Sequence, residues 1–325
     1  MFGIDDKLNQ PVSWLTLDKI ALLCLCVFSA CFIFYFAART KNEKRMFITK
    51  ICIMIALIAL EIGRMIWFAV RAKHLNIELN VWTTINFHNC TIQIWLTVLT
   101  IFLSFFLKKD NKLLQIFYNI LYNIATLGGI VTFIYPQFIN SQYSIFHFRN
   151  LQSIISHILL ITTPFLLSHY GYFKIKIRNF VYIPFAWCCV GSISGFASIC
   201  ARFNFAFAYT CELFDALNIF IAVPFHIVVV MLIMIAISFI ILFLQCLYKH
   251  KKHKEPLFEK LNAFEIVVLA TSVIYATTHA ILFKQLCFLQ NRTIGICMLI
   301  PFVFFVSAIT IAYFILKKRD FKFKK

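Results

Sequence analysis

Long apolar stretches recur along almost the whole chain, and this feature restricts the fold more than any other. A helix needs roughly 20 mainly apolar residues to cross a bilayer, and it must satisfy its backbone hydrogen bonds internally because lipid offers none. We count nine such stretches: 15–38, 46–70, 86–107, 115–136, 151–169, 180–201, 219–248, 262–283 and 294–316. The sequence therefore predicts an all-α, polytopic transmembrane helical bundle of about nine spans.

Composition agrees with this class. The chain is 62% hydrophobic and only 14% charged, against roughly 25% charged residues in soluble domains. Its net charge of +18 would suggest nucleic-acid binding in a soluble protein. Here the basic residues lie mostly between apolar stretches, so we expect loops at anionic lipid headgroups and no nucleic acid. We expect a multi-pass protein of the cell membrane.

The number of lysine and arginine residues alternates between low and high from one predicted loop to the next. Cytoplasmic loops carry the excess of these residues. Assigning the dense loops to the cytoplasm places 22 of them inside and 8 outside, with Arg64 left in the second span. This pattern predicts an N-terminus outside the membrane and a cytoplasmic C-terminus.

The largest polar segment separates the last two spans from the rest. We expect residues 1–250 to form a transmembrane core that holds the site, and 251–261 to form a basic cytoplasmic loop. Residues 262–316 then supply two additional helices, and 317–325 a basic cytoplasmic tail. The core alone contains seven predicted spans.

Polar side chains inside the membrane are the natural candidates for function, because they are expensive in lipid and usually face the bundle interior. The predicted orientation places Glu61, Arg64, His88, Cys90 and His157 toward the outer leaflet. Glu61 and Arg64 are three residues apart, so they share a helix face and are expected to pair with each other.

One face of the third predicted span is polar. Its members recur at intervals of three or four residues: Cys90, Gln93, Thr97, Thr100 and Ser104. This spacing places all five on one side of a helix. Hydroxyl residues commonly line helix contacts in membranes, so we interpret the threonines and the serine as packing residues.

A shorter polar stripe opens the fifth span. Asn150, Ser153 and His157 share one face, and the next residue on that face, Ile161, is apolar. His157 is therefore the deepest polar group of its stripe. A lone histidine of this kind is either a helix-contact residue or a base, and the pattern leaves both open.

Position distinguishes Cys90 from the other eleven cysteines. It falls in the first turn of a helix, where backbone N–H groups and the helix dipole favour a thiolate. His88 is two residues away and points to another side if this turn is helical, so a histidine on another helix, His157, is the better partner. The cysteines show no CxxC pairing, which indicates neither a zinc site nor a disulfide framework.

Other kinds of site find less support. The chain has no phosphate loop, HExxH motif or serine nucleophile elbow. A metal site would combine His88 and Cys90 with residues from the set His147, His157 and His279, but no recognised ligand spacing supports it. We expect no metal and no cofactor.

Three segments carry a family resemblance. The stretches INFHNCTIQIWL, IATLGGIVTFIYPQFIN and FHFRNLQSIISH resemble, in order and approximate spacing, the core of the YwaF-type integral membrane proteins, over roughly residues 46–230. Animal relatives of that family include a multi-spanning phospholipid acyltransferase. The resemblance implies that Cys90 is a catalytic nucleophile and His157 its base.

We therefore expect acyl transfer through a thioester near the outer leaflet, with membrane phospholipids or a lipidated acceptor as partners. Supporting roles are expected for the side chains around the dyad. His88 or Gln93 would stabilise the oxyanion, Glu61 would orient a histidine, and Arg64 or Arg149 would hold a lipid phosphate. The neighbouring His147 and Asn150 complete the set. A transporter with a polar path between helices and a non-catalytic scaffold are the alternatives.

Overall fold

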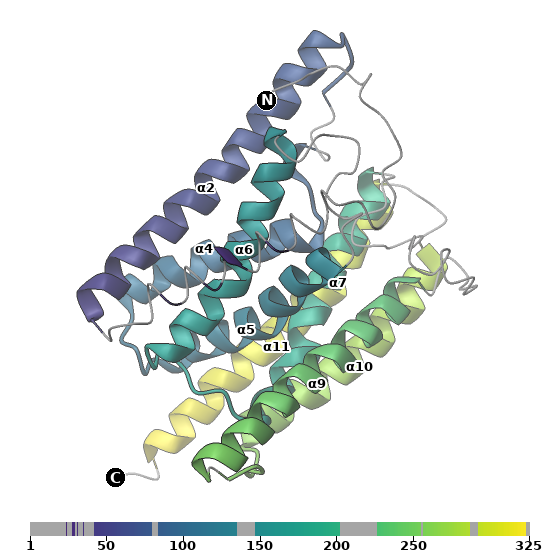
Figure 1. Cartoon of the computed structure of the whole chain (residues 1–325). Helices are drawn as coiled ribbons and strands as arrows, with labels where there is room; N and C mark the ends of the chain where they lie inside the picture. Colours follow the sequence, from purple (N-terminus) through teal and green to yellow (C-terminus); the bar gives the residue numbers. More distant parts are fainter. Residues whose placement is uncertain are drawn as a thin grey trace. The chain divides into compact units, whose positions relative to one another are not determined.

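The computed structural model describes residues 42–79, 84–134, 147–201, 226–254, 256–286 and 292–322, with five isolated positions between 24 and 35. The long elements in these ranges are all helices (Figure 1). They are α2 (Glu43–His74), α4 (Asn89–Phe106), α5 (Lys112–Ile134), α6 (Phe148–His169), the short 3-10 helix η3 (Ile177–Val181), α7 (Tyr182–Ala201), α9 (His226–His253), α10 (Ala263–Leu286) and α11 (Arg292–Lys322).

Within the described ranges, seven helical segments are long and apolar enough to cross a membrane: Glu43–His74, Asn89–Phe106, Phe148–His169, Ile177–Ala201, Val228–His253, Ala263–Phe283 and Ile296–Leu316. They confirm the all-α, multi-pass prediction and correspond to seven of the nine predicted spans. The first predicted span lies almost entirely outside the described residues. The fourth coincides with α5, which is not among the seven. The count of nine and the orientation stay predictions.

The chain divides into two compact units. The first comprises residues 1–86 and 90–174, and the second comprises 87–89 and 175–325. Helices α2, α5 and α6 and nearly all of α4 belong to the first unit, whereas η3, α7, α9, α10 and α11 belong to the second. The predicted boundaries at residues 250 and 262 stay a prediction.

Contacts at both ends of α2 show how it lies against α6 in the first unit. Lys109, just after α4, contacts Glu43 at the start of α2 (3.1 Å) and donates to the carbonyl of Tyr170 at the end of α6 (2.7 Å). Near the other end of α2, the ring of Trp67 contacts the ring of His147, with 5.6 Å between their centroids. His147 is the N-cap of α6. Helices α2 and α6 therefore run in opposite directions.

A buried lysine lies near the Lys109 end, and the sequence pattern had not singled it out. Lys50 of α2 is 3% exposed, donates to Ser104 Oγ (3.0 Å) and lies 4.6 Å from the Tyr172 ring centroid. Burial and the nearby Glu43 raise the pKa of Tyr172 to about 12. The phenol therefore keeps its proton at neutral pH and donates to Glu43 (3.4 Å). Buried polar side chains therefore lie near both ends of this unit.

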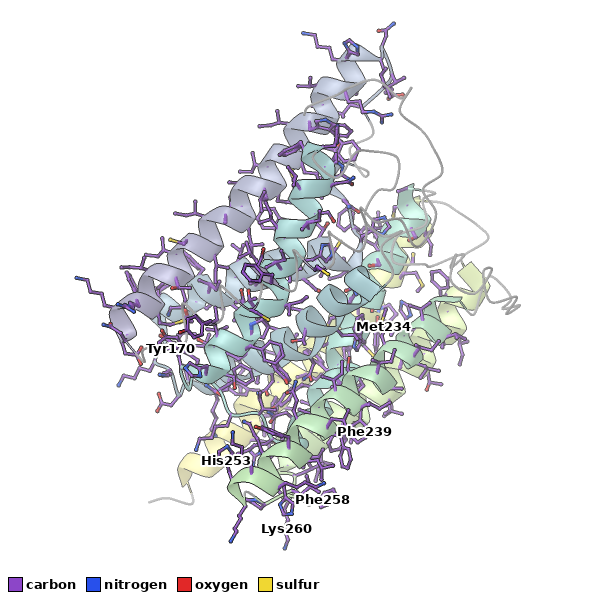
Figure 2. All side chains as sticks on the ribbon, in the orientation of Figure 1. Tyr170, Met234, Phe239, His253, Phe258 and Lys260 are labelled. Carbon is purple, nitrogen blue, oxygen red and sulfur yellow. The ribbon has the colours of Figure 1, made fainter. Side chains whose placement is uncertain are left out.

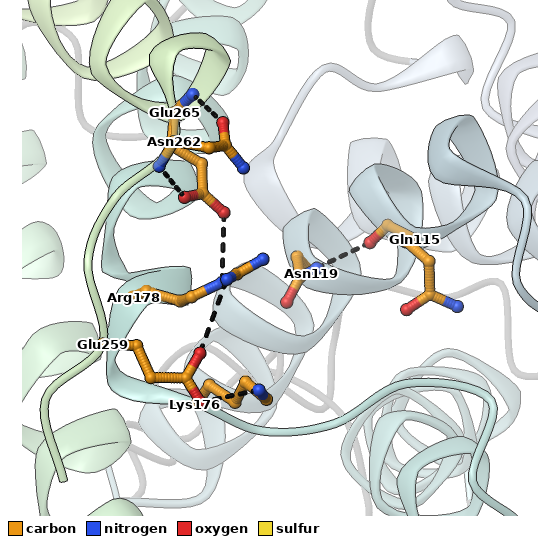
Figure 3. Close-up of polar contacts among 7 residues, drawn as sticks. All are labelled: Gln115, Asn119, Lys176, Arg178, Glu259, Asn262 and Glu265. Atoms are coloured by element: carbon orange, nitrogen blue, oxygen red, sulfur yellow. Dashed lines mark hydrogen bonds and ion pairs between the residues drawn. The ribbon is translucent and has the colours of Figure 1, made fainter. Parts of the chain in front are cut away.

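In the second unit, α7 contacts α9, α10 and α11. Ser192 of α7 and Tyr275 of α10 share a buried hydrogen bond of 2.7 Å. Many apolar side chains face outward, such as Phe239 on α9 (Figure 2). Arg178 of η3 lies between Glu259 and Glu265 (Figure 3).

Candidate active site

Cys90 is the second residue of α4, which confirms its predicted place in the first turn. The thiol is half-buried. The charged side chains near it include Glu61 and Arg64. His88 is also half-buried and stands just before the helix, in a bend. Helical periodicity therefore does not set its direction relative to Cys90.

The buried pair Glu61 and Arg64 forms as its spacing predicts. Arg64 donates through Nε (3.0 Å) and through a terminal nitrogen to one carboxylate oxygen of Glu61. The same terminal nitrogen donates to the backbone carbonyls of Thr84 (2.8 Å) and Ile85 (2.9 Å). Arg64 thus joins α2 to the segment that leads into the Cys90 turn. The proposed roles of Glu61 toward a histidine and of Arg64 toward a phosphate stay predictions.

The polar face of α4 is turned inward. Gln93, Thr97 and Thr100 are fully buried, and Cys90 and Ser104 at its two ends are partly exposed. The hydroxyls donate back to carbonyls of their own helix, Thr97 to Gln93 (2.7 Å) and Thr100 to Leu96 (2.7 Å). This is the packing role expected for them.

Two adjacent glycines of α5 leave room for the Gln93 side chain of α4 and for close approach of α6. A Cβ added at Gly128 would lie 2.5 Å from the Gln93 side-chain amide, so that amide occupies the space a side chain would need. A Cβ added at Gly129 would clash with Ile161 and lie 3.2 Å from the His157 carbonyl. The Gly128–Gly129 pair therefore brings Gln93, one turn after Cys90, and the His157 turn against neighbouring points of one helix.

His157 of α6 is 5% exposed. Its Nδ1 lies 2.6 Å from the Ser153 carbonyl, with the Ser153 hydroxyl at 3.4 Å. A carbonyl oxygen only accepts, so Nδ1 carries the proton in a neutral ring and Nε2 has the lone pair. The contact thereby fixes the tautomer that a base acting through Nε2 requires.

The supporting residues before His157 gather at the start of α6. His147 is the N-cap, and its Nδ1 accepts the Arg149 backbone N–H at 3.2 Å. Arg149 also approaches Gln152 Oε1 at 3.4 Å. Asn150 is buried on the His157 side of the helix, where the predicted stripe placed it.

Sequence reasoning missed several neighbours of this site. Trp67 contacts His147 and Arg149, Phe68 contacts Arg149, and the Gln93 amide packs against Gly128. The sequence could have identified Trp67, because it follows Arg64 by three residues and therefore lies on the same face of α2. Gly128 was visible only as an interruption of an apolar stretch. Among the residues that the structure describes, no three His, Cys, Asp or Glu side chains gather as metal ligands.

Comparison with known protein families finds a match. Residues 11–242 match the model of the TMEM164 family, which is more than half of the chain and includes every candidate residue above. The matched range ends before α10 and α11. The chain matches no curated protein and no solved structure.

Proposed function

The chain belongs to the TMEM164 family, and from this premise we propose that it is a lipid acyltransferase of the cell membrane. Cys90 is the nucleophile and His157 the base. The likeness to YwaF-type proteins and to their animal acyltransferase relatives is part of this proposal. Acyl transfer near the outer leaflet further depends on the predicted orientation.

The observation that carries the proposal is the environment of His157. Its Nδ1 is held on the Ser153 carbonyl at 2.6 Å, which leaves Nε2 as the proton acceptor. The glycines of α5 bring its helix turn close to Gln93, on the same face as Cys90. A thiol at a helix head and a base with a fixed tautomer are the two components of a Cys-His nucleophile.

The reaction then proceeds in two transfers. His157 Nε2 takes the proton from the Cys90 thiol, and the thiolate attacks the carbonyl carbon of a phospholipid ester. The tetrahedral intermediate collapses to a thioester while the departing lysolipid oxygen takes the proton from His157. An acceptor hydroxyl or amine, on a second lipid or a lipidated molecule, gives a proton to His157 and attacks the thioester, and the released thiolate takes the proton back from His157.

Backbone and amide donors at the head of α4 stabilise the developing oxyanion in this proposal. The N–H groups of the first turn of α4 and the Gln93 side chain, on the same helix face as Cys90, are the proposed donors. Such donors contribute most in a water-poor site. His88 stays an alternative donor, and anionic headgroups remain the proposed partners of the basic cytoplasmic loops.

The direct test is detection of the thioester. Purified protein is reconstituted with phospholipid, quenched in acid and examined by intact-protein mass spectrometry. We expect wild type to gain one hydroxylamine-sensitive acyl mass on Cys90. His157→Gln should slow its formation roughly 100-fold or more, as loss of a general base does. Cys52→Ser is the matched control, because Cys52 is an exposed thiol on α2, and it should acylate like wild type.

Two outcomes would contradict the proposal. Equal acylation in wild type and His157→Gln would exclude the dyad. Unchanged acyl profiles of membrane lipids and lipoproteins in cells carrying Cys90→Ala would exclude the enzyme. Solute movement in vesicles that persists in Cys90→Ser would instead support the transporter. For that function, the buried Lys50 and its partner Ser104 provide polar groups at the other end of the first unit.

A further inference from the structure

Three arginines gather on two adjacent aromatic rings of α2. The guanidinium carbons of Arg71 and Arg149 each lie 5.7 Å from the Trp67 ring centroid. Arg149 also lies 4.8 Å from the Phe68 ring centroid, and Arg64 lies 5.7 Å from it. An aromatic contact at such distances holds a guanidinium in place without removing its charge. Positive charge is therefore concentrated around the end of α2.

The three arginines have different surroundings. Arg64 is buried and directs its donors to Glu61 and to the carbonyls of Thr84 and Ile85. Arg71 and Arg149 are both partly exposed. An anion from outside therefore reaches Arg71 and Arg149 more readily than Arg64.

The start of α6 adds to the positive potential at this place. Arg149 is in the first turn of this 22-residue helix, and the His147 cap lies 5.6 Å from the Trp67 ring. A helix N-terminus carries a partial positive charge and favours phosphate. The planar guanidinium group of arginine can donate two parallel hydrogen bonds to phosphate oxygens. Tryptophan is enriched at the headgroup level of a bilayer.

We propose that Arg71 and Arg149, held on Trp67 at the start of α6, bind the phosphate of a phospholipid headgroup. This inference rests on the proposed function and assigns residues to the headgroup end of its phospholipid substrate. His157 follows Arg149 by eight residues, an axial rise of about 12 Å. In a glycerophospholipid the ester carbonyls lie on the acyl side of the phosphate. A phosphate at Arg149 thus directs these carbonyls along α6 toward His157.

The test measures binding in Cys90→Ala protein, which cannot form a thioester, so its result is independent of catalysis. The probes are short-chain phosphatidylglycerol, short-chain phosphatidylcholine and water-soluble glycerol phosphate. We expect both lipids to bind more tightly than glycerol phosphate. Arg71→Gln and Arg149→Gln should each weaken lipid binding about tenfold or more, as loss of charged hydrogen bonds does. Arg149→Lys, which keeps charge but lacks the fork, should fall between wild type and Arg149→Gln.

Lys73→Gln is the matched control, since Lys73 is an exposed cation in the same last turn of α2 as Arg71. It should change binding less than threefold. Equal weakening in Lys73→Gln would show general surface attraction and overturn the site. Glycerol phosphate binding as tightly as the lipids would overturn the headgroup assignment in favour of a free phosphate. Thermal unfolding of each variant in detergent identifies any that fail to fold, and Arg149→Lys then carries the comparison.

Discussion

At the scale of single residues, Arg64 links two segments of the candidate site. One buried side chain binds Glu61 on its own helix and two carbonyls just before the Cys90 turn. Buried ion pairs give little net stability, but removing one partner leaves a costly uncompensated charge. These contacts tie Arg64 to the backbone that leads into the turn of Cys90, the proposed nucleophile.

Replacing Arg64 therefore tests positioning. Arg64→Gln should lower the free energy of unfolding by about 3 to 5 kcal/mol, because Glu61 stays buried without its cation. Arg64→Lys keeps the charge but cannot serve Glu61 and both carbonyls, so thioester formation should slow by roughly 100-fold while the protein still folds. Thermal unfolding and acylation rates measure the two effects. A wild-type acylation rate in folded Arg64→Lys would argue against the positioning role.

At the scale of helices, α5 sets the spacing of the site through its glycine pair. Small residues let membrane helices approach closely where lipid gives little drive for association. At Gly128 the approaching group is the Gln93 amide, the movable end of a side chain. An alanine there is expected to displace that amide without separating the helices.

Gly128→Ala should consequently act through Gln93. If the amide is an oxyanion donor, the variant should acylate roughly 100-fold more slowly with almost unchanged stability. Gln93→Ala should show a similar loss, and the double variant little more than either one, because both changes remove one interaction. Gly191→Ala is the control, since its Cβ would meet Met231 of α9. Additive losses in the double variant would disprove the link.

The start of α10 shows how a loop between helices is fixed. Arg178 approaches Glu265 at 3.2 Å and Glu259 at 3.4 Å, while Lys176 binds Glu259 at 2.6 Å (Figure 3). Asn262 and Glu265 exchange hydrogen bonds of 2.9 Å between side chains and backbone N–H groups. This reciprocal cap is a strong helix start signal.

Burial predicts which of these pairs matters. Glu265 is buried and Glu259 is partly exposed, so Arg178→Ala should lower the free energy of unfolding by about 1 to 2 kcal/mol and Glu259→Ala by less than about 1 kcal/mol. Chemical denaturation in detergent measures both. A larger effect of Glu259→Ala would show that the outer pair holds the loop.

At the scale of the whole molecule, the predicted orientation of the later spans depends on whether α5 crosses the membrane. Lys109 and Tyr170 meet at 2.7 Å, so α4 and α6 end at the same end of the first unit. The chain must return to the other end before α6 begins. The 23 residues of α5 span about 34 Å, enough for the hydrocarbon core. We therefore keep α5 among the nine predicted spans.

Reporter fusions test this orientation. A fluorescent protein fused after residue 325 should fluoresce and a periplasmic-type phosphatase there should be inactive, because the basic tail is expected inside. Fusions in the 256–260 loop should behave like those at the C-terminus, and fusions near residue 76 should show the opposite. Phosphatase activity at the C-terminus would mean that the number of spans is even or that the orientation is reversed.

The sequence by itself determined the class of structure and part of the site. Apolar stretches of membrane length require helices, because lipid cannot satisfy backbone hydrogen bonds. The start of the apolar stretch 86–107 placed Cys90 in a first helical turn, while residue spacing grouped the inward face of α4 and paired Glu61 with Arg64. These are local properties, since they depend on residues within a few turns of one helix.

Only the tertiary structure decided which helices are neighbours. Hydropathy scarcely distinguishes one helix partner from another, because lipid tails are as apolar as the side chains they replace. The fit of Gln93 against Gly128, the reach of Arg64 to Thr84 and the burial of Lys50 against Ser104 join segments that are far apart in sequence. Such contacts depend on side-chain shape and hydrogen-bond geometry across helices, which no pattern along one helix records.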